Sequence, residues 1–207
     1  MLALGIPFQG VIGGITVLTD LNPWIVSLHL LLSMALIGGS VLLVVHVRGA
    51  TGTALPSRAV ALVRVTFAVL VVVVYLGTVV TGSGPHAGDA DSPRNGLDPH
   101  VMSHVHASSV YVLVALTLAT IIALRGTSAV RFAVLLLGVE LLQGTIGFVQ
   151  YFTDLPVALV AAHLVGAAIL VATGTRLMLA AQAVGERRMA RQPSASGSLS
   201  SSTNPQR

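Results

Sequence analysis

The sequence contains no cysteine among its 207 residues. Disulfide bonds, thiolate-bound zinc, iron–sulfur clusters and covalently attached c-type haem all need cysteine sulfur, so each of them is excluded. Lysine is also absent, and the net charge of +4 therefore comes from arginine. In a soluble protein this balance would suggest nucleic acid as a partner. Here we expect no nucleic acid, because arginine more simply supplies the charges that orient a membrane chain.

Charged residues of all kinds are scarce. They make up 9% of the chain, against 54% hydrophobic residues and a mean hydropathy of +0.89. Soluble domains carry roughly 25% charged residues, so the sequence predicts an all-α integral membrane protein embedded in the lipid bilayer. Since a spanning helix needs roughly 20 apolar residues, six transmembrane helices are expected, at residues 2–19, 23–46, 60–82, 99–124, 129–150 and 156–182.

The arginines predict the orientation of these spans. Arginine-rich short loops stay in the cytoplasm, and the arginines fall in every second connection and near the C-terminus: Arg48, Arg58, Arg64, Arg125, Arg131, Arg176, Arg187, Arg188 and Arg191. The opposite connections hold only Arg94, together with Asp20, Asp89, Asp91, Asp98 and Asp154. We expect a multi-pass protein of the plasma membrane with both termini cytoplasmic.

Two stretches of the chain resemble each other. QGVIGGITVLTDLNPWIVSLH, residues 9–29, and QGTIGFVQYFTDLPVALVAAH, residues 143–163, share Gln-Gly, Thr-Asp-Leu and a final histidine at matched positions. The first two spans therefore match the last two. By the same offset, the third and fourth spans should have counterparts preceding Met1. We expect one complete four-helix bundle plus half of a duplicated second bundle.

The duplication suggests a division of the chain. Residues 1–48 are expected to be the remnant of an N-terminal half, 49–59 a cytoplasmic linker, and 60–182 a C-terminal four-helix half that binds haem. Residues 183–207 form a Ser-rich polar segment with too little apolar surface to fold, and are expected to be a disordered cytoplasmic tail.

Three histidines lie at one expected depth. His29, His106 and His163 each follow the outer end of an even-numbered span by a few residues, so each is expected roughly 10 Å below the outer surface. A single histidine at this depth is more often a packing residue. Three at equal depth favour haem iron as the metal that they bind, because two facing imidazoles can clamp an iron porphyrin.

Other polar residues allow more than one interpretation. His100 and His104 are four residues apart and form a weak candidate for a small metal site, while His106 points nearly the opposite way. His46 and His86 are expected to be solvated. Glu140 is either a proton-handling group or a protonated packing residue. Gln9 and Gln143 are expected to bond across the bundle, at a haem edge or to the backbone.

The chain resembles the haem A synthase family of the actinobacterial type, a group of cytochrome oxidase assembly proteins with eight membrane helices. The resemblance rests on QGVIGGITVLTDL with SLHLLLSM, on GTVVTGSGPHAGDADSPR, on the helix with His106, and on QGTIGFVQYFTDLPVALVAAHLVGAA, and covers Gln9 to about Met178. Relative to the family, the first two transmembrane helices, with their Glu-x-x-x-His-Arg motif and cysteine-bearing loop, are expected to be missing.

The resemblance implies an activity and a role for each histidine. The family is a haem-dependent oxidoreductase that oxidises a methyl group of haem O to the formyl group of haem A. His106 and His163 correspond to the cofactor-binding pair that holds haem b, and His29 to a catalytic-site histidine at the substrate haem O. An electron acceptor, not identified, and the preceding haem O synthase are possible partners. The alternative is a non-catalytic membrane b-type cytochrome that serves electron transfer or assembly.

Overall fold

This computed structural model describes residues 2–49, 55–85 and 91–182. These residues contain six α-helices and no β-strand. The helices are α1 Leu2–Leu18, α2 Pro23–Val47, α3 Ser57–Ser83, α4 Pro99–Ala123, α5 Val130–Phe152 and α6 Val157–Gln182. The predicted spans are confirmed as helices, and each predicted boundary lies within three residues of the observed one. The expected tail at 183–207 lies outside the described residues.

Five of these helices, α2 to α6, are long and apolar enough to cross a membrane. Their outward faces carry large exposed apolar side chains, for example Leu42, Val72, Leu118, Leu142 and Val165. Lipid is the environment in which such surfaces are stable. The protein is therefore an all-α integral membrane protein. α1 is apolar as well but has only 17 residues and contains Pro7.

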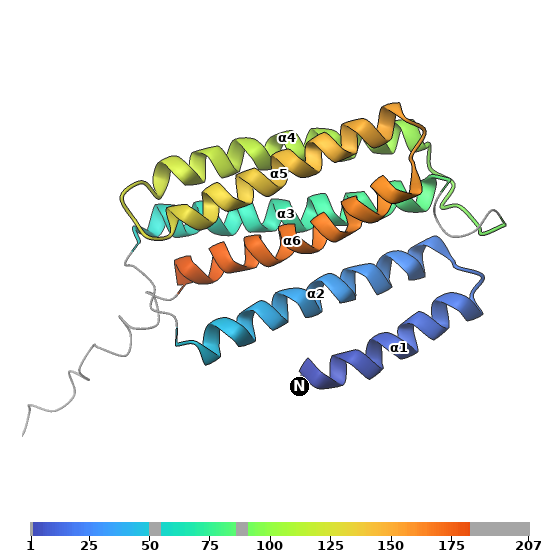
Figure 1. The fold of residues 1–207 in the computed structure, drawn as a ribbon, viewed down its shortest axis with the longest axis horizontal. Coiled ribbons are helices and arrows are strands. Elements are labelled where there is room, and N and C mark those ends of the chain that lie inside the picture. Colours follow the sequence, from blue (N-terminus) through green and yellow to red (C-terminus); the bar gives the residue numbers. More distant parts are fainter. Residues whose placement is uncertain (1, 50–54, 86–90, 183–207) are drawn as a thin grey trace, which may run out of the picture.

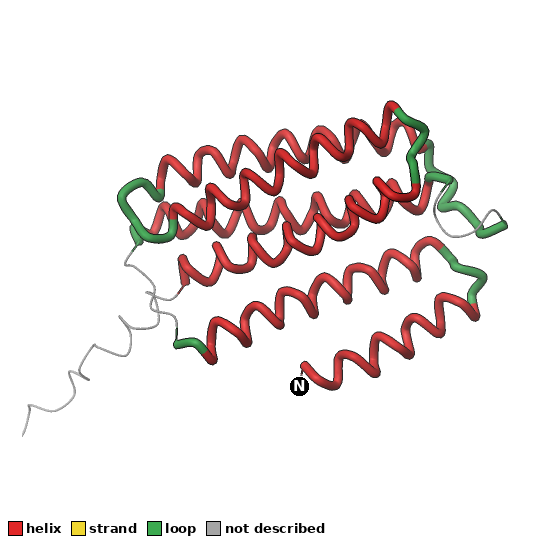
Figure 2. Tube along the Cα trace, in the orientation of Figure 1, coloured by secondary structure: helices red, strands yellow, loops and turns green. Residues whose placement is uncertain are grey.

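Helices α3, α4, α5 and α6 pack as a closed four-helix bundle, in which each helix contacts the next and α6 contacts α3 (Figure 1). Leucines from all four helices fill its centre and are almost completely buried: Leu70, Leu113, Leu136 and Leu177. α2 packs against α3 and α6 on one side of this bundle, and α1 packs against α2 (Figure 2). The predicted four-helix bundle with an additional pair of helices, α1 and α2, is confirmed. The proposed domain boundaries stay a prediction.

Helices α2 and α4 both begin with a side-chain N-cap that is followed by proline. The side chain of Asn22 accepts a hydrogen bond from the backbone N–H of Trp24 at 3.0 Å, and Asp98 accepts one from Val101 at 2.9 Å. Both caps are followed by proline at the first helical position, where its missing N–H costs nothing. These caps fix the point from which the depth of His29 and His106 is counted.

The repeated Thr-Asp-Leu sequence builds the same turn twice. Asp20 and Leu21 have φ of 53° and 56°, and Asp154 and Leu155 have 57° and 56°. In both turns the leucine N–H bonds back to the carbonyl five residues earlier, at 2.8 Å and 3.0 Å, which closes the helix with a left-handed cap. Left-handed backbone is uncommon outside glycine, so the repeat is a repeat of structure as well as of sequence.

Candidate functional site

The three histidines share a level in the folded chain. His29, His106 and His163 follow the first residues of α2, α4 and α6 by six, seven and six positions, and all three helices begin at the same end of the molecule (Figure 1). At 1.5 Å per residue this is about 10 Å from that end. The three histidines are thus equally far along their helices, while their depth below a membrane surface stays a prediction.

His106 and His163 come from opposite corners of the four-helix bundle. α4 and α6 are separated by α3 on one side and α5 on the other, yet the two imidazoles are near enough to interact electrostatically. Both side chains are mostly buried. His29 lies outside this bundle, on α2.

Each histidine packs against a glycine of the helix that precedes its own. A Cβ placed on Gly13, Gly77 or Gly147 would lie 3.5, 3.3 or 3.6 Å from Cε1 of His29, His106 or His163, in that order. The imidazoles therefore rest directly on the backbone of α1, α3 and α5. A larger residue at these positions would occupy the space of the imidazole.

The Nδ1 atom of each of these histidines is buried and has no hydrogen-bond partner among the described residues. A buried polar atom without a partner is costly, and native structures rarely tolerate it without a reason. Three of them at one level indicate imidazoles whose bonding is completed by something other than this part of the chain. Two facing neutral imidazoles are what an iron porphyrin requires as axial ligands, so His106 and His163 fit such a group.

The two repeated glutamines lie one helical turn from the histidine contacts. Gln143 on α5 packs its side-chain amide directly onto the backbone of Gly166 of α6. Nε2 of Gln143 and both amide atoms of Gln9 are buried without a partner in the described residues. Of the three alternatives, a bond across the bundle or to the backbone is not found at these atoms within the described residues, and contact with a haem edge stays a prediction.

Glu140 lies inside the four-helix bundle, with 2% of its surface exposed. Its Oε1 accepts a hydrogen bond of 2.7 Å from the hydroxyl of Thr117 on α4, which is itself fully buried. Its Oε2 is buried and has no partner among the described residues. The carboxyl group thus links α4 to α5 and keeps one oxygen unused, and both interpretations of Glu140 stay open.

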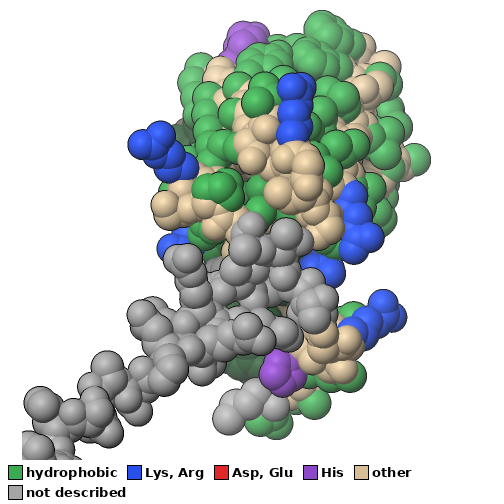
Figure 3. Space-filling view, turned by 90° about the vertical axis from the view of Figure 1, so that its left-hand side faces the viewer, with side chains coloured by type: hydrophobic (Ala, Val, Ile, Leu, Met, Phe, Trp, Pro, Cys, Tyr) green, Lys and Arg blue, Asp and Glu red, His purple; other side chains and the backbone are tan. Residues whose placement is uncertain are grey.

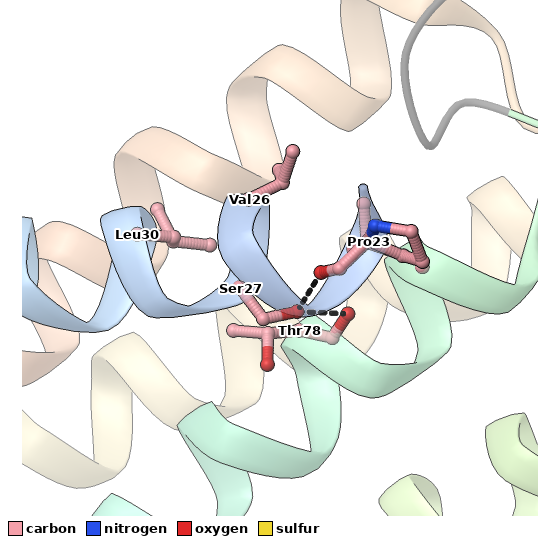
Figure 4. A pocket seen from close by; sticks show the side chains of 7 residues that line it. Pro23, Val26, Ser27, Leu30 and Thr78 are labelled. Carbon is pink, nitrogen blue, oxygen red and sulfur yellow. Dashed lines mark hydrogen bonds between the residues drawn. The ribbon is translucent and has the colours of Figure 1, made fainter. Parts of the chain in front are cut away.

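A small pocket lies between the start of α2 and the end of α3 (Figure 4). Ser27 lines it, donates to the carbonyl of Pro23 at 2.7 Å and lies 3.5 Å from the carbonyl of Thr78. Ser27 is two residues from His29, and Thr78 follows the glycine that supports His106. The pocket is therefore located between the two histidine neighbourhoods.

The remaining histidines of the described chain, His46, His100 and His104, lie at the surface. His100 and His104 are exposed on α4, with ring centroids 4.3 Å apart, and Tyr151 of α5 lies 6.0 Å from His104. No group of three or more metal-ligating side chains is found in the described ranges, and the weak metal-site interpretation gains nothing. His46 is exposed, as expected. His86 lies outside the described residues.

Comparison with protein families identifies the chain. Residues 1–175 match the sequence model of COX15-CtaA, described as cytochrome oxidase assembly protein. The chain belongs to this family. The match covers all six helices up to the last part of α6, and the expected family resemblance is confirmed. No curated protein and no solved structure matches the chain.

Sequence reasoning missed two parts of this cytochrome oxidase assembly protein's site. The supporting glycines were one, although Gly13 and Gly147 occupy the same position in the two repeats and follow Gln9 and Gln143 by four residues. That spacing could have revealed them. Thr117, the partner of Glu140, was the other, and nothing in the sequence distinguishes it from the neighbouring threonines.

Proposed function

We propose that this protein is a haem A synthase, which oxidises a methyl group of haem O to a formyl group for the assembly of cytochrome c oxidase. The observation that carries the proposal is the arrangement of His29, His106 and His163. They are equally far along their helices, each lies on a glycine, and the Nδ1 atom of each has no partner among the described residues. Membership of the cytochrome oxidase assembly family supports the same reaction.

His106 and His163 are the proposed ligands of a resident haem b. Bound there, the haem would supply a one-electron redox centre within the membrane. The chain's own contribution is to hold two neutral imidazoles at a fixed separation, backed by Gly77 and Gly147. α4 and α6 do not lie next to each other in the bundle, and their contacts with α3 and α5 fix the separation of the two helices that carry these histidines.

His29 is proposed to hold the substrate haem O on the α1–α2 side. Conversion of a methyl to a formyl group with oxygen from water releases four electrons and four protons. An acceptor must take up the electrons, and an electron-transfer partner is therefore part of the proposal. The haem O synthase that makes the substrate is a further candidate partner.

The proposed location is the plasma membrane, with the arginine-rich end in the cytoplasm. The described arginines of the connections α2–α3 and α4–α5 lie at one end of the bundle, and the histidines lie near the other. The haem sites would then open toward the outer half of the membrane.

A second candidate function is a b-type cytochrome without synthase activity. It is favoured by the location of both proposed haem b ligands inside the closed α3–α6 bundle, whereas His29 lies outside it. Such a protein would transfer electrons or assist assembly and would not oxidise haem O.

Haem extraction separates the two candidates. The full chain is expressed in cells that make haem O but lack haem A synthase, and extracted haems are resolved by chromatography. We expect haem A to appear with the unaltered chain, and to disappear with His29→Ala while the low-spin spectrum of the purified protein persists. Haem-loaded protein that never yields haem A would identify the cytochrome instead.

A further inference from the structure

Two arginines lie over a single phenylalanine at the arginine-rich end of the bundle. The guanidinium carbon of Arg176 on α6 is 4.3 Å from the centroid of the Phe132 ring, and that of Arg131 is 4.7 Å from the same centroid. The two cations are close enough to repel each other. Stacking on an aromatic ring stabilises a guanidinium by its flat face and leaves its N–H groups at the edge free.

Neither guanidinium has a counter-charge in the described part of the chain. No hydrogen bond or ion pair from Arg131 or Arg176 to a described residue is formed. The described carboxylates are Asp20, Asp91, Asp98 and Asp154, which belong to the opposite end, and Glu140, which is bonded to Thr117. Figure 3 shows arginines distributed over this end of the molecule, with no acidic side chain visible among them. Two neighbouring cations thus have no carboxylate partner among the residues that the structure describes.

The position of Arg131 and Arg176 along their helices indicates which kind of anion could bind them. Phe132 is the third residue of α5, and Arg176 lies six residues before the end of α6. Arg176 also follows the first residue of α6 by 19 positions, which at 1.5 Å per residue is close to the ~30 Å thickness of the hydrocarbon core. If α6 begins at one boundary of the hydrocarbon core, Arg176 lies close to the other boundary, next to which the lipid phosphates are found.

We infer that Arg131, Phe132 and Arg176 form a binding site for the phosphate of an anionic phospholipid. Arginine presents its N–H donors as a planar fork that matches phosphate oxygens, and basic sites between membrane helices are suited to acidic headgroups. Phe132 holds the two forks in place. This site is distant from the histidines and does not depend on haem binding.

Lipid retention tests the site. The purified full chain is incubated with phosphatidylglycerol or phosphatidylcholine in detergent, and bound lipid is counted by native mass spectrometry. We expect the chain to retain phosphatidylglycerol in preference, and Arg131→Gln with Arg176→Gln to abolish the preference. Each arginine removed should lower the affinity roughly fivefold. Arg64→Gln on α3 is the matched control, since Arg64 is exposed and has no ring contact in the described residues.

Two further variants make the result decisive. Phe132→Leu keeps both charges and removes the ring, and should weaken retention less than the double variant but more than Arg64→Gln. If the double variant does not fold, Phe132→Leu and Arg176→Lys decide the question. Equal retention of phosphatidylglycerol by all variants would overturn the inference. Competition by inorganic phosphate alone at millimolar concentration would assign the site to a free anion and would overturn the lipid assignment.

Discussion

At the scale of single residues, the histidines are the most unusual feature of this chain. A polar ring nitrogen enclosed between apolar helices loses its hydrogen bonds to water, and the Nδ1 atoms of His106 and His163 do not regain them from the described residues. The simplest physical explanation is a ligand that completes their bonding. The two residues should therefore be required for that ligand and not for the fold.

Replacing either residue tests this directly. We expect His106→Ala and His163→Ala each to abolish the low-spin haem absorption of the purified protein, because one axial ligand is lost. Helix content by circular dichroism should stay the same, since no hydrogen bond of the His163 ring to the described chain is found and the His106 ring has one, to the backbone of Val73. His46→Ala, at an exposed site on α2, is the control and should keep the spectrum. Unchanged haem content in both variants would refute the assignment of the ligands.

Glu140 is the second residue whose burial calls for an explanation. Its hydrogen bond with Thr117 joins α4 to α5, so we expect Glu140→Gln to keep the fold, because the amide oxygen replaces Oε1 as acceptor. Thr117→Val should lower the free energy of unfolding by about 1–3 kcal/mol, because it leaves a second buried carboxyl oxygen without a partner.

Thermal unfolding in detergent measures both variants, with Thr145→Val on the exposed face of α5 as control. If Glu140→Gln folds and binds haem but makes no haem A, Glu140 handles protons. If it keeps full activity, Glu140 is a packing residue. A Thr117→Val protein as stable as the unaltered chain would contradict the role of the hydrogen bond.

At the scale of helices, those that provide a glycine alternate along the chain with those that provide a histidine. Odd-numbered helices α1, α3 and α5 each provide a glycine, and even-numbered helices α2, α4 and α6 each provide the histidine that rests on it. Backbone is more rigid than a side chain, so a histidine supported by backbone has few alternative positions. The pairing of helices therefore sets the orientation of each imidazole.

The tightest of these contacts yields a prediction. We expect Gly77→Val to displace the imidazole of His106, because even a Cβ would lie 3.3 Å from its Cε1. The haem should bind more weakly, and the electron paramagnetic resonance signal of its low-spin iron should shift. Gly144→Val is the matched control, because a Cβ there would meet nothing within 4 Å. Identical spectra for the two variants would mean that Gly77 does not position His106.

The helices themselves could be predicted from sequence, and so could the depth of the histidines. Apolar runs interrupted by Asn22-Pro23 and Asp98-Pro99 locate the helix starts, and a residue count then gives the depth. The rotation of each helix could not be predicted. In lipid the outward face is as apolar as the core, so periodicity does not show that Gly77 faces His106 or that Thr117 faces Glu140.

At the scale of the whole molecule, the closed bundle and the α1–α2 pair differ in their packing. The bundle buries leucines from all four of its helices, whereas α1 and α2 contribute a single residue, Met34, to the buried hydrophobic core of the described chain. The repeat relates the α1–α2 pair to α5–α6, and their turns agree in backbone angles. Sequence similarity therefore predicted the local structure of the pair but not its position beside α6 and α3.

The absence of cysteine allows the orientation of the whole molecule to be tested without background. Asp154→Cys places a thiol in the exposed α5–α6 turn, and Arg125→Cys places one in the exposed α4–α5 connection at the other end. Because arginine-rich loops are retained in the cytoplasm, we expect a membrane-impermeant maleimide added to intact cells to label Asp154→Cys and not Arg125→Cys. Both should be labelled once the cells are opened. The reverse pattern in intact cells would place the histidines in the cytoplasmic half of the membrane, and the proposed orientation would be wrong.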